Sequence, residues 1–168
     1  MTKAFVALGA NLEDPKSQVM QALAELDRLP GSRVVARSSL YRTAPVGFAA
    51  QPAFINAVAQ VETGLPARAL MSALLELEDR HGRRRSVPNA PRTLDLDLLL
   101  YADLVRDEPA LALPHPRLHE RRFVLVPLCD LAPDLVHPRL GVTLSALLAA
   151  CPDTSRVVPF SAAAGATR

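Results

Sequence analysis

Two aspartates, Asp95 and Asp97, interrupt the apolar segment PRTLDLDLLL at residues 91–100. On a strand, residues two apart share a face about 7 Å from each other, whereas on a helix they point in nearly opposite directions. The flanking leucines favour a strand that starts near Thr93. Two ionised carboxylates on a half-buried face repel each other, so they need a cation. Arg92 could neutralise one and Mg²⁺ ions could neutralise both; the alternative is two solvated aspartates at a strand end.

A second set of residues is cationic and could bind phosphate. Arginine presents a fork of N–H donors to phosphate oxygens, and Mg²⁺ held by carboxylates and substrate phosphates is typical of nucleotide sites. The set consists of Arg83, Arg85, Arg92, His115, Arg121 and Arg122. Each arginine alone could be a solvated surface charge, and His115 could be structural, but clustering ahead of the aspartates favours phosphate binding. The P-loop motif is absent from the sequence, which excludes a P-loop fold.

A third set, Phe54, Asn56 and Phe123, could bind a flat heterocycle. Asparagine offers a donor and an acceptor to the amide edge of such a ring, and two phenylalanines could hold its faces. Their placement is noticeable because aromatic residues make up only 4% of the chain. The alternative is that the phenylalanines belong to the core and that Asn56 is a satisfied buried amide.

Hydrophobic spacing and turn residues predict the elements that position these groups. The predicted strands cover residues 3–8, 33–41 and 54–63 and the segment that starts near Thr93. Helices are predicted from Asp14-Pro15 to Pro30-Gly31 and from Pro66 to Gly82, with long loops at 43–52 and 83–91. The order β-α-β-β-α-β is that of the ferredoxin-like split motif. Both helices should then cover one face of an antiparallel sheet and leave the other face open to a ligand.

The C-terminal part of the sequence is less regular. Pro114-His115-Pro116 predicts a rigid elbow. Residues 123–131 predict a short helix, in which Pro127 is tolerable only in the first turn, and Thr143 is the predicted cap of a helix over 144–150. Residues 156–160 predict a small strand. We therefore expect an α+β protein with a ferredoxin-like core and C-terminal helical additions. Residues 1–160 should form a single domain and residues 161–168 a frayed tail.

Composition limits the functional classes. The 168 residues are 49% hydrophobic and 21% charged, as in soluble globular domains, and the net charge of +2 does not indicate a broad nucleic-acid surface. No apolar run is long enough to span a membrane, and the strand-like start does not resemble a signal peptide. Two cysteines without metal-type spacing suggest a reducing compartment, so we expect a cytoplasmic protein.

Several short motifs occur in the order found in one enzyme family. They are Gly9-Ala10-Asn11, Tyr41-Arg42-Thr43-x-Pro45, Phe54-x-Asn56, residues 91–97, Pro114-His115 and Arg121-x-Phe123. Because it contains these motifs in this order, the segment of residues 3–140 resembles the 6-hydroxymethyl-7,8-dihydropterin pyrophosphokinase family of folate synthesis. The resemblance implies transfer of pyrophosphate from ATP to the pterin hydroxymethyl group with release of AMP, two Mg²⁺ ions, and a ferredoxin-like fold with three mobile loops.

The resemblance also implies roles for matching residues. Catalytic roles fall to Arg83, Arg92, Asp95, Asp97, His115 and Arg121, with Asp95 and Asp97 as the ligands of both metals. Contacts with ATP fall to Glu78, Arg85, Arg92, Leu98, His115 and Arg121. The pterin pocket is implied to contain Thr43, Pro45, Val46, Phe54, Asn56 and Phe123. The sequence departs from the family at Ser86, Pro88, Asn89 and Pro116, where Lys, a basic residue, Trp and Tyr are common; these changes bear on loop closure and ATP affinity.

Two rival hypotheses use the same residues differently. A two-metal phosphodiesterase or nuclease would need further carboxylates, and Glu78 is the nearby candidate. A non-enzymatic ferredoxin-like module could bind RNA or a regulatory ligand, although RNA binding calls for several aromatics on the central strands and Phe54 is a single one. Under the pyrophosphokinase hypothesis we expect small-molecule substrates, no nucleic-acid or membrane partner, and a monomer.

Overall fold

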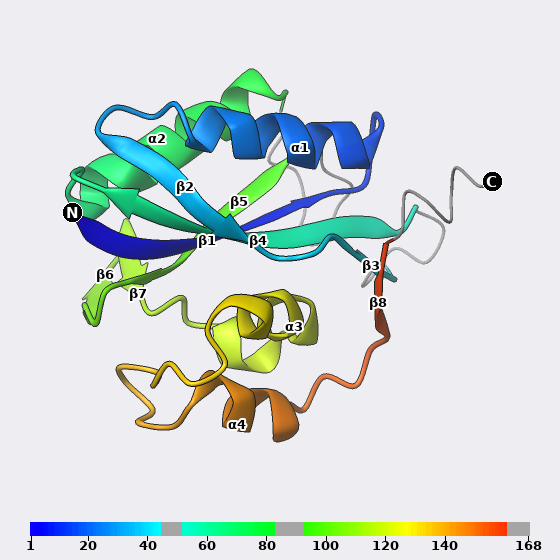
Figure 1. The fold of residues 1–168 in the computed structure, drawn as a ribbon, viewed down its shortest axis with the longest axis vertical. Coiled ribbons are helices and arrows are strands. Elements are labelled where there is room, and N and C mark those ends of the chain that lie inside the picture. Colours follow the sequence, from blue (N-terminus) through cyan, green and yellow to red (C-terminus); the bar gives the residue numbers. More distant parts are fainter. Residues whose placement is uncertain (45–51, 83–92, 161–168) are drawn as a thin grey trace.

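The computed structural model describes residues 1–44, 52–82 and 93–160 and has one large antiparallel sheet with helices on both faces (Figure 1). The strands are β1 (Thr2–Ala10), β2 (Ser32–Arg37), β3 (Tyr41–Thr43), β4 (Phe54–Thr63), β5 (Asp95–Tyr101) and β8 (Val157–Pro159). Their order is β5-β1-β4-β3-β8, and β2 also pairs with β4. A separate hairpin consists of β6 (Arg106–Glu108) and β7 (Leu111–Leu113). The protein is therefore α+β, as predicted.

Two helices, α1 (Pro15–Leu26) and α2 (Ala67–Arg80), cover one face of the sheet (Figure 1). Asp14 caps α1, as predicted, because its carboxylate accepts a hydrogen bond from the Ser17 backbone N–H. The helix ends at Leu26, before the predicted stop at Pro30-Gly31. Each helix has an apolar stripe, which was the basis of its prediction. The stripes pack against alternate residues of β1, β4 and β5, and together these residues form the larger core.

The opposite face is covered in part by two helices, whereas the prediction left all of it free for a ligand. The covering helices are α3 (Arg122–Leu131) and α4 (Leu144–Ala149). They pack over Phe5, Val58 and Leu99, which are apolar and lie on this face of β1, β4 and β5. Burying these side chains is favourable. The same face carries polar residues at its other end, which stays accessible.

Several boundaries differ from the prediction. The predicted strand 33–41 is two strands, β2 and β3, separated where the Ser38 hydroxyl accepts a hydrogen bond from the Val58 backbone N–H at 2.9 Å. Pro127 lies inside α3 and not in its first turn. The hairpin β6–β7 was not predicted. By contrast, β4 has its predicted bounds, Thr143 caps α4, and β8 forms within residues 156–160.

No helix among the described residues is both long and apolar enough to cross a membrane.

Candidate active site

A cavity of about 340 Å³ lies at the accessible end of the sheet, beside the N-terminus of α3. Its walls come from strands β1, β3, β4 and β5, from the segment before α3 and from α3 itself. Among its lining residues are many that the sequence singled out: Thr43, Phe54, Asn56, Asp95, Asp97, Arg121 and Phe123. The fold therefore brings together members of the carboxylate, cationic and ring-binding sets, which are distant in sequence.

Strand register places the two carboxylates on the cavity face. Asp95 lies opposite Gly9 and Asp97 opposite Ala7, and both β1 residues also line the cavity. The intervening Leu96 is 5% exposed and belongs to the core under the helices. This alternation is the one predicted for a strand, although β5 begins at Asp95, two residues after Thr93.

The side chains of Arg121 and His115 face Asp97 from outside the sheet. The Arg121 Nη1 lies 4.0 Å from Oδ2 of Asp97, and the His115 Nε2 lies 3.8 Å from Oδ1. Burial, together with the charge of Arg121, lowers the pKa of His115 to about 4. Its Nδ1 accepts a hydrogen bond from the Arg117 backbone N–H at 3.1 Å. Neutral His115 therefore carries its proton on Nε2, the nitrogen that faces Asp97.

The other end of the cavity carries an amide and aromatic rings. Asn56 is 8% exposed and its Oδ1 accepts a hydrogen bond from the Thr43 hydroxyl. A Cβ atom on Gly9, the residue opposite Asn56 on β1, would lie 2.7 Å from the Asn56 Nδ2, so a side chain at position 9 would displace the Asn56 amide. Phe54 lies two residues before Asn56 on β4, and Phe123 reaches the cavity from α3. This end can contact a flat ring on its faces and its edge.

Two predicted ATP contacts lie away from the cavity. Glu78 is 1% exposed on α2, where its Oε2 accepts a hydrogen bond from the Leu96 backbone N–H at 2.7 Å, on the helix side of the sheet. Leu98 is 1% exposed in the core on that side. The ATP contact of Leu98 stays a prediction from the family resemblance. The predicted residues Pro45, Val46, Arg83, Arg85 and Arg92 lie outside the described residues, as do Ser86, Pro88 and Asn89.

The cavity also contains residues that the sequence did not single out, namely Arg117, Glu120 and Asp153. Glu120 Oε1 lies 3.8 Å from Nε of Arg117, so these side chains partly neutralise each other. Asp153 comes from the segment between α4 and β8. No spacing rule connects a residue in that segment with the central strands.

The donor set at β5 fits magnesium. Within the described ranges, no three or more His, Cys, Asp or Glu side chains form a group that could hold a metal ion. A closed structural zinc site would need such a group, usually of four ligands. Mg²⁺ instead binds commonly through one or two carboxylates and completes its shell with substrate phosphates and water. Asp95 and Asp97, part-exposed on a cavity wall, match this second arrangement.

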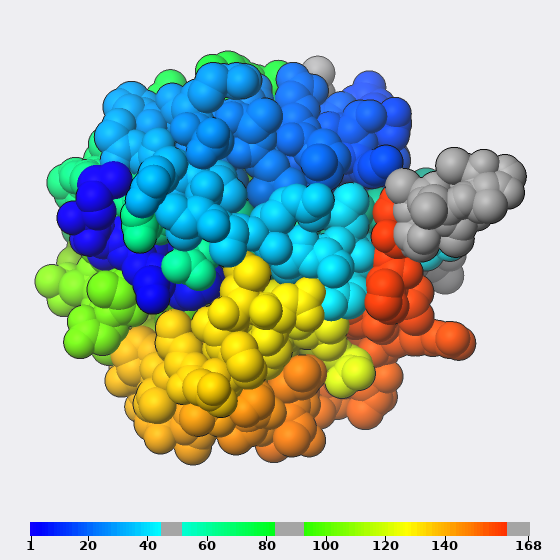
Figure 2. Space-filling model, viewed as in Figure 1, coloured from blue at the N-terminus to red at the C-terminus, as the bar shows by residue number. Residues whose placement is uncertain are grey.

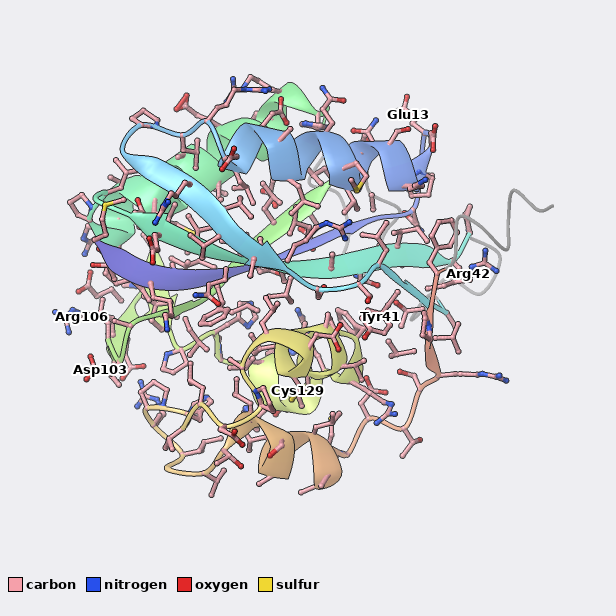
Figure 3. The ribbon with its side chains drawn as sticks, in the orientation of Figure 1. Glu13, Tyr41, Arg42, Asp103, Arg106 and Cys129 are labelled. Carbon is pink, nitrogen blue, oxygen red and sulfur yellow. The ribbon has the colours of Figure 1, made fainter. Side chains whose placement is uncertain are left out.

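A pair of hydrogen bonds connects α3, which carries Phe123, to β3, which carries Thr43, and to the segment before it. The Tyr41 hydroxyl donates to Oδ2 of Asp130 at 2.6 Å, and the Ser39 backbone N–H donates to the same oxygen at 3.2 Å. Tyr41 lies between β3 and α3 in Figure 3. Burial and the Asp130 carboxylate raise the pKa of Tyr41 to about 12.

We expect the Tyr41 contact to produce a pH dependence of stability. Because the pKa of folded Tyr41 is above the unfolded value of about 10, its contribution is complete below pH ~10 and is lost as the pH rises towards 12. Tyr41→Phe should lower the free energy of unfolding by about 1 kcal/mol at pH 8 and flatten the fall above pH ~10. Urea unfolding between pH 8 and pH ~11.5 measures both effects. An unchanged alkaline slope in Tyr41→Phe would contradict this assignment.

Comparisons with known proteins agree on one family. Residues 5–133 match the family model described as 7,8-dihydro-6-hydroxymethylpterin-pyrophosphokinase. A Pseudomonas aeruginosa protein named 2-amino-4-hydroxy-6-hydroxymethyldihydropteridine pyrophosphokinase is 48% identical over 150 residues, which cover 89% of this chain and 92% of the relative. A Haemophilus influenzae protein of the same name is 41% identical over 138 residues, covering 82% and 86%.

Longer proteins contain a similar unit. The Schizosaccharomyces pombe folic acid synthesis protein fol1 is 41% identical over 135 residues, which cover 80% of this chain but 18% of that protein. A crystal structure of Plasmodium falciparum HPPK-DHPS with SDX-DHP superimposes with a TM-score of 0.66 at 14% identity, covering 89% of this chain and 43% of the other. At that identity the match supports the fold alone.

Proposed function

The chain belongs to the 7,8-dihydro-6-hydroxymethylpterin pyrophosphokinase family, and we propose that the cavity holds the pterin at its Asn56 end and the ATP phosphates at its Asp95–Asp97 end. The protein transfers pyrophosphate from ATP to the hydroxymethyl group of 6-hydroxymethyl-7,8-dihydropterin in folate synthesis. This placement of the two substrates is supported by a single cavity whose lining includes carboxylates, an arginine, a buried amide and two phenylalanines. Both reactants can then approach each other within one site.

The chemistry requires no nucleophile from the protein. The hydroxymethyl oxygen of the pterin attacks the β-phosphorus of ATP and loses its proton to solvent, the bond from that phosphorus to the bridging oxygen of the α-phosphate breaks, and AMP leaves. Arg121 can stabilise negative charge on the phosphate oxygens, since its guanidinium lies beside Asp97 in the cavity wall. Neutral His115 can donate a hydrogen bond from Nε2 without adding charge. Holding the two substrates in one geometry removes much of the entropic barrier.

Asp95 and Asp97 would hold two Mg²⁺ ions together with the phosphates. The bound ions would neutralise phosphate charge and help align the two reacting oxygens. The protein contributes two carboxylates fixed by strand register on one face of β5. Of the residues assigned to ATP, Arg121 and His115 have positions that fit this arrangement. Arg83, Arg85, Arg92 and Glu78 remain predictions from the family resemblance.

We further propose a ferredoxin-like core for residues 1–160. The order β5-β1-β4 with β2 and β3 beyond β4, and two helices on one face, supports this classification. We also propose a cytoplasmic monomer that acts on small molecules and not on nucleic acid. The nuclease hypothesis has little support, because Glu78, its additional carboxylate, faces the helix side of the sheet.

Asn56 provides the test that separates a pterin site from any other ATP-phosphate site. Asn56→Ala should weaken pterin binding by about one to two orders of magnitude, because a ligand edge left without a partner costs about 1–3 kcal/mol. It should leave the affinity for an Mg-ATP analogue almost unchanged, since no phosphate or metal contact is removed. Two calorimetric titrations, one with each ligand, measure the difference.

Gln60→Ala is the matched control for Asn56→Ala. Gln60 is an amide on the same strand and the same face as Asn56, but it does not line the cavity. Its replacement should alter neither affinity. If both ligands bind more weakly to Asn56→Ala, Asn56 has a structural role. If neither does, the pterin binds elsewhere.

A further inference from the structure

The helix α3 begins without a cap from its own sequence. Arg121 occupies its N-cap position with φ −119° and ψ 105°, and no N-cap side chain accepts a hydrogen bond there. The first backbone N–H groups of a helix need acceptors from elsewhere. This helix start carries Arg121, which lies beside Asp97, and Phe123, which lines the cavity. A contact that fixes the start of α3 therefore also fixes the positions of Arg121 and Phe123.

The missing acceptor is Asp153, which is distant in sequence. Its Oδ2 accepts a hydrogen bond from the backbone N–H of Arg122, the first residue of α3, at 3.0 Å. Its Oδ1 accepts one from the Ser155 backbone N–H at 2.9 Å, which holds the carboxylate in place. Although partial burial opposes ionisation, the hydrogen bonds from Ser155 and Arg122 lower the pKa of Asp153. A carboxylate at a helix N-terminus is also favoured by the helix dipole.

Asp153 lies at the cavity and not merely behind it. It is one of the lining residues, together with Phe123 and Thr43. The segment that carries it leaves α4 and continues into β8, which pairs with β3 in antiparallel register, with Val157 opposite Thr43. Figure 2 shows this red segment running along the side of the molecule from the orange α4 layer towards the strands. The segment thus connects α3 to the strand wall of the cavity.

We propose that Asp153 is a positioning residue for the pterin: it caps α3 from outside the helix and thereby holds Phe123 and Arg121 against the cavity. The proposal rests on the proposed function of the site. Residue 153 lies beyond residues 5–133, the part that matches the family model. The role therefore comes from the C-terminal segment and not from the matched region.

Asp153→Ala should weaken pterin binding about tenfold in the presence of a non-hydrolysable ATP analogue, as expected for loss of a helix cap that orients a binding residue. Asp153→Asn should stay within about threefold of the wild type, because asparagine caps helices about as well as aspartate. In a Phe123→Ala background the Asp153→Ala change should have much less effect, because its influence passes through the missing ring. Thr154→Ala, at an exposed neighbouring position, should match the wild type.

A second pair of variants removes the donor instead of the acceptor. Arg122→Pro and Arg122→Ala both lose the guanidinium, but only proline also loses the N–H that Asp153 accepts. Proline is tolerated at the first helical position, and the extended backbone of Arg121 suits a residue before proline. Arg122→Pro should bind the pterin about tenfold more weakly than Arg122→Ala. This pair carries the test if Asp153→Ala does not fold.

The outcomes distinguish the positioning role from the function. If the wild type binds the pterin and both Asp153→Ala and Arg122→Pro bind it equally well, the positioning role is wrong and the proposed function stands. If Asp153→Ala has the same effect with and without Phe123, Asp153 does not act through that ring and the proposal is also overturned. If the wild type itself binds no pterin, the proposed function fails.

Discussion

Replacing Asp97 or Asp95 by alanine should lower the rate of pyrophosphate transfer by at least about 10³-fold, because metal-assisted charge stabilisation contributes several kcal/mol. Both carboxylates lie on the cavity face of β5, and they are the two acidic residues of that strand. Under the proposed magnesium binding, removing one would leave a single carboxylate to hold the ions. The fold should remain intact, because the change also removes repulsion between the two carboxylates in the ligand-free protein.

Steady-state rates at saturating Mg²⁺ and thermal unfolding measure the two parts of this prediction. Asp103→Ala is the control, since Asp103 is exposed in the turn after β5 and lies on the other side of the molecule from Tyr41 (Figure 3). It should retain the wild-type rate. Near-normal activity of Asp97→Ala or Asp95→Ala at saturating Mg²⁺ would disprove the metal assignment.

Arg121→Ala should reduce transition-state stabilisation by about 2–4 kcal/mol, or roughly 30- to 1000-fold in kcat, as lost electrostatic donors do. The Arg121 side chain is 22% exposed and its guanidinium carbon lies 5.7 Å from the centre of the Phe123 ring. This contact holds the guanidinium between the ring-binding end and the carboxylates. Arg121→Lys should lie between the wild type and Arg121→Ala, because lysine keeps the charge but loses the planar fork.

The matched control for Arg121 is Arg106→Ala. Arg106 is exposed on β6 and donates a hydrogen bond to the Val105 carbonyl at 2.9 Å. It shares the charge of Arg121 but not its position, so kcat should be unchanged in Arg106→Ala. Equal losses in Arg106→Ala and Arg121→Ala would mean that the arginines act as a diffuse positive field and that Arg121 has no specific contact with the phosphates.

Local periodicity was enough to predict most of the elements around the site. The alternation in residues 54–63 predicted β4 with its full bounds, and the spacing of Asp95 and Asp97 predicted that they share a face. Capping by Asp14 and by Thr143 was also visible in the sequence. These features depend on neighbouring residues, where side-chain direction follows the backbone period.

The position of Glu78 was missed although the sequence contained a signal. Glu78 lies four residues after Leu74 on α2, on the stripe that also contains Leu70. Residues at this spacing share one helix face, so a carboxylate there should be buried towards the sheet.

Contacts between distant segments could not be predicted from the sequence. Asp153 caps a helix that starts 31 residues earlier, and Asp130 binds Tyr41 across 89 residues. No sequence period relates these pairs, because they depend on how α3 and α4 pack on the sheet. That packing follows from apolar residues such as Phe5 on a face that the prediction had left open.

The acceptor of the pyrophosphate group is the central claim, and product analysis tests it most directly. The protein is incubated with Mg-ATP, with and without 6-hydroxymethyl-7,8-dihydropterin, and AMP, ADP and the pterin diphosphate are quantified. We expect one AMP for each pterin diphosphate formed and no AMP when the pterin is omitted. AMP release that does not depend on the pterin, or ADP as the nucleotide product, would contradict the account.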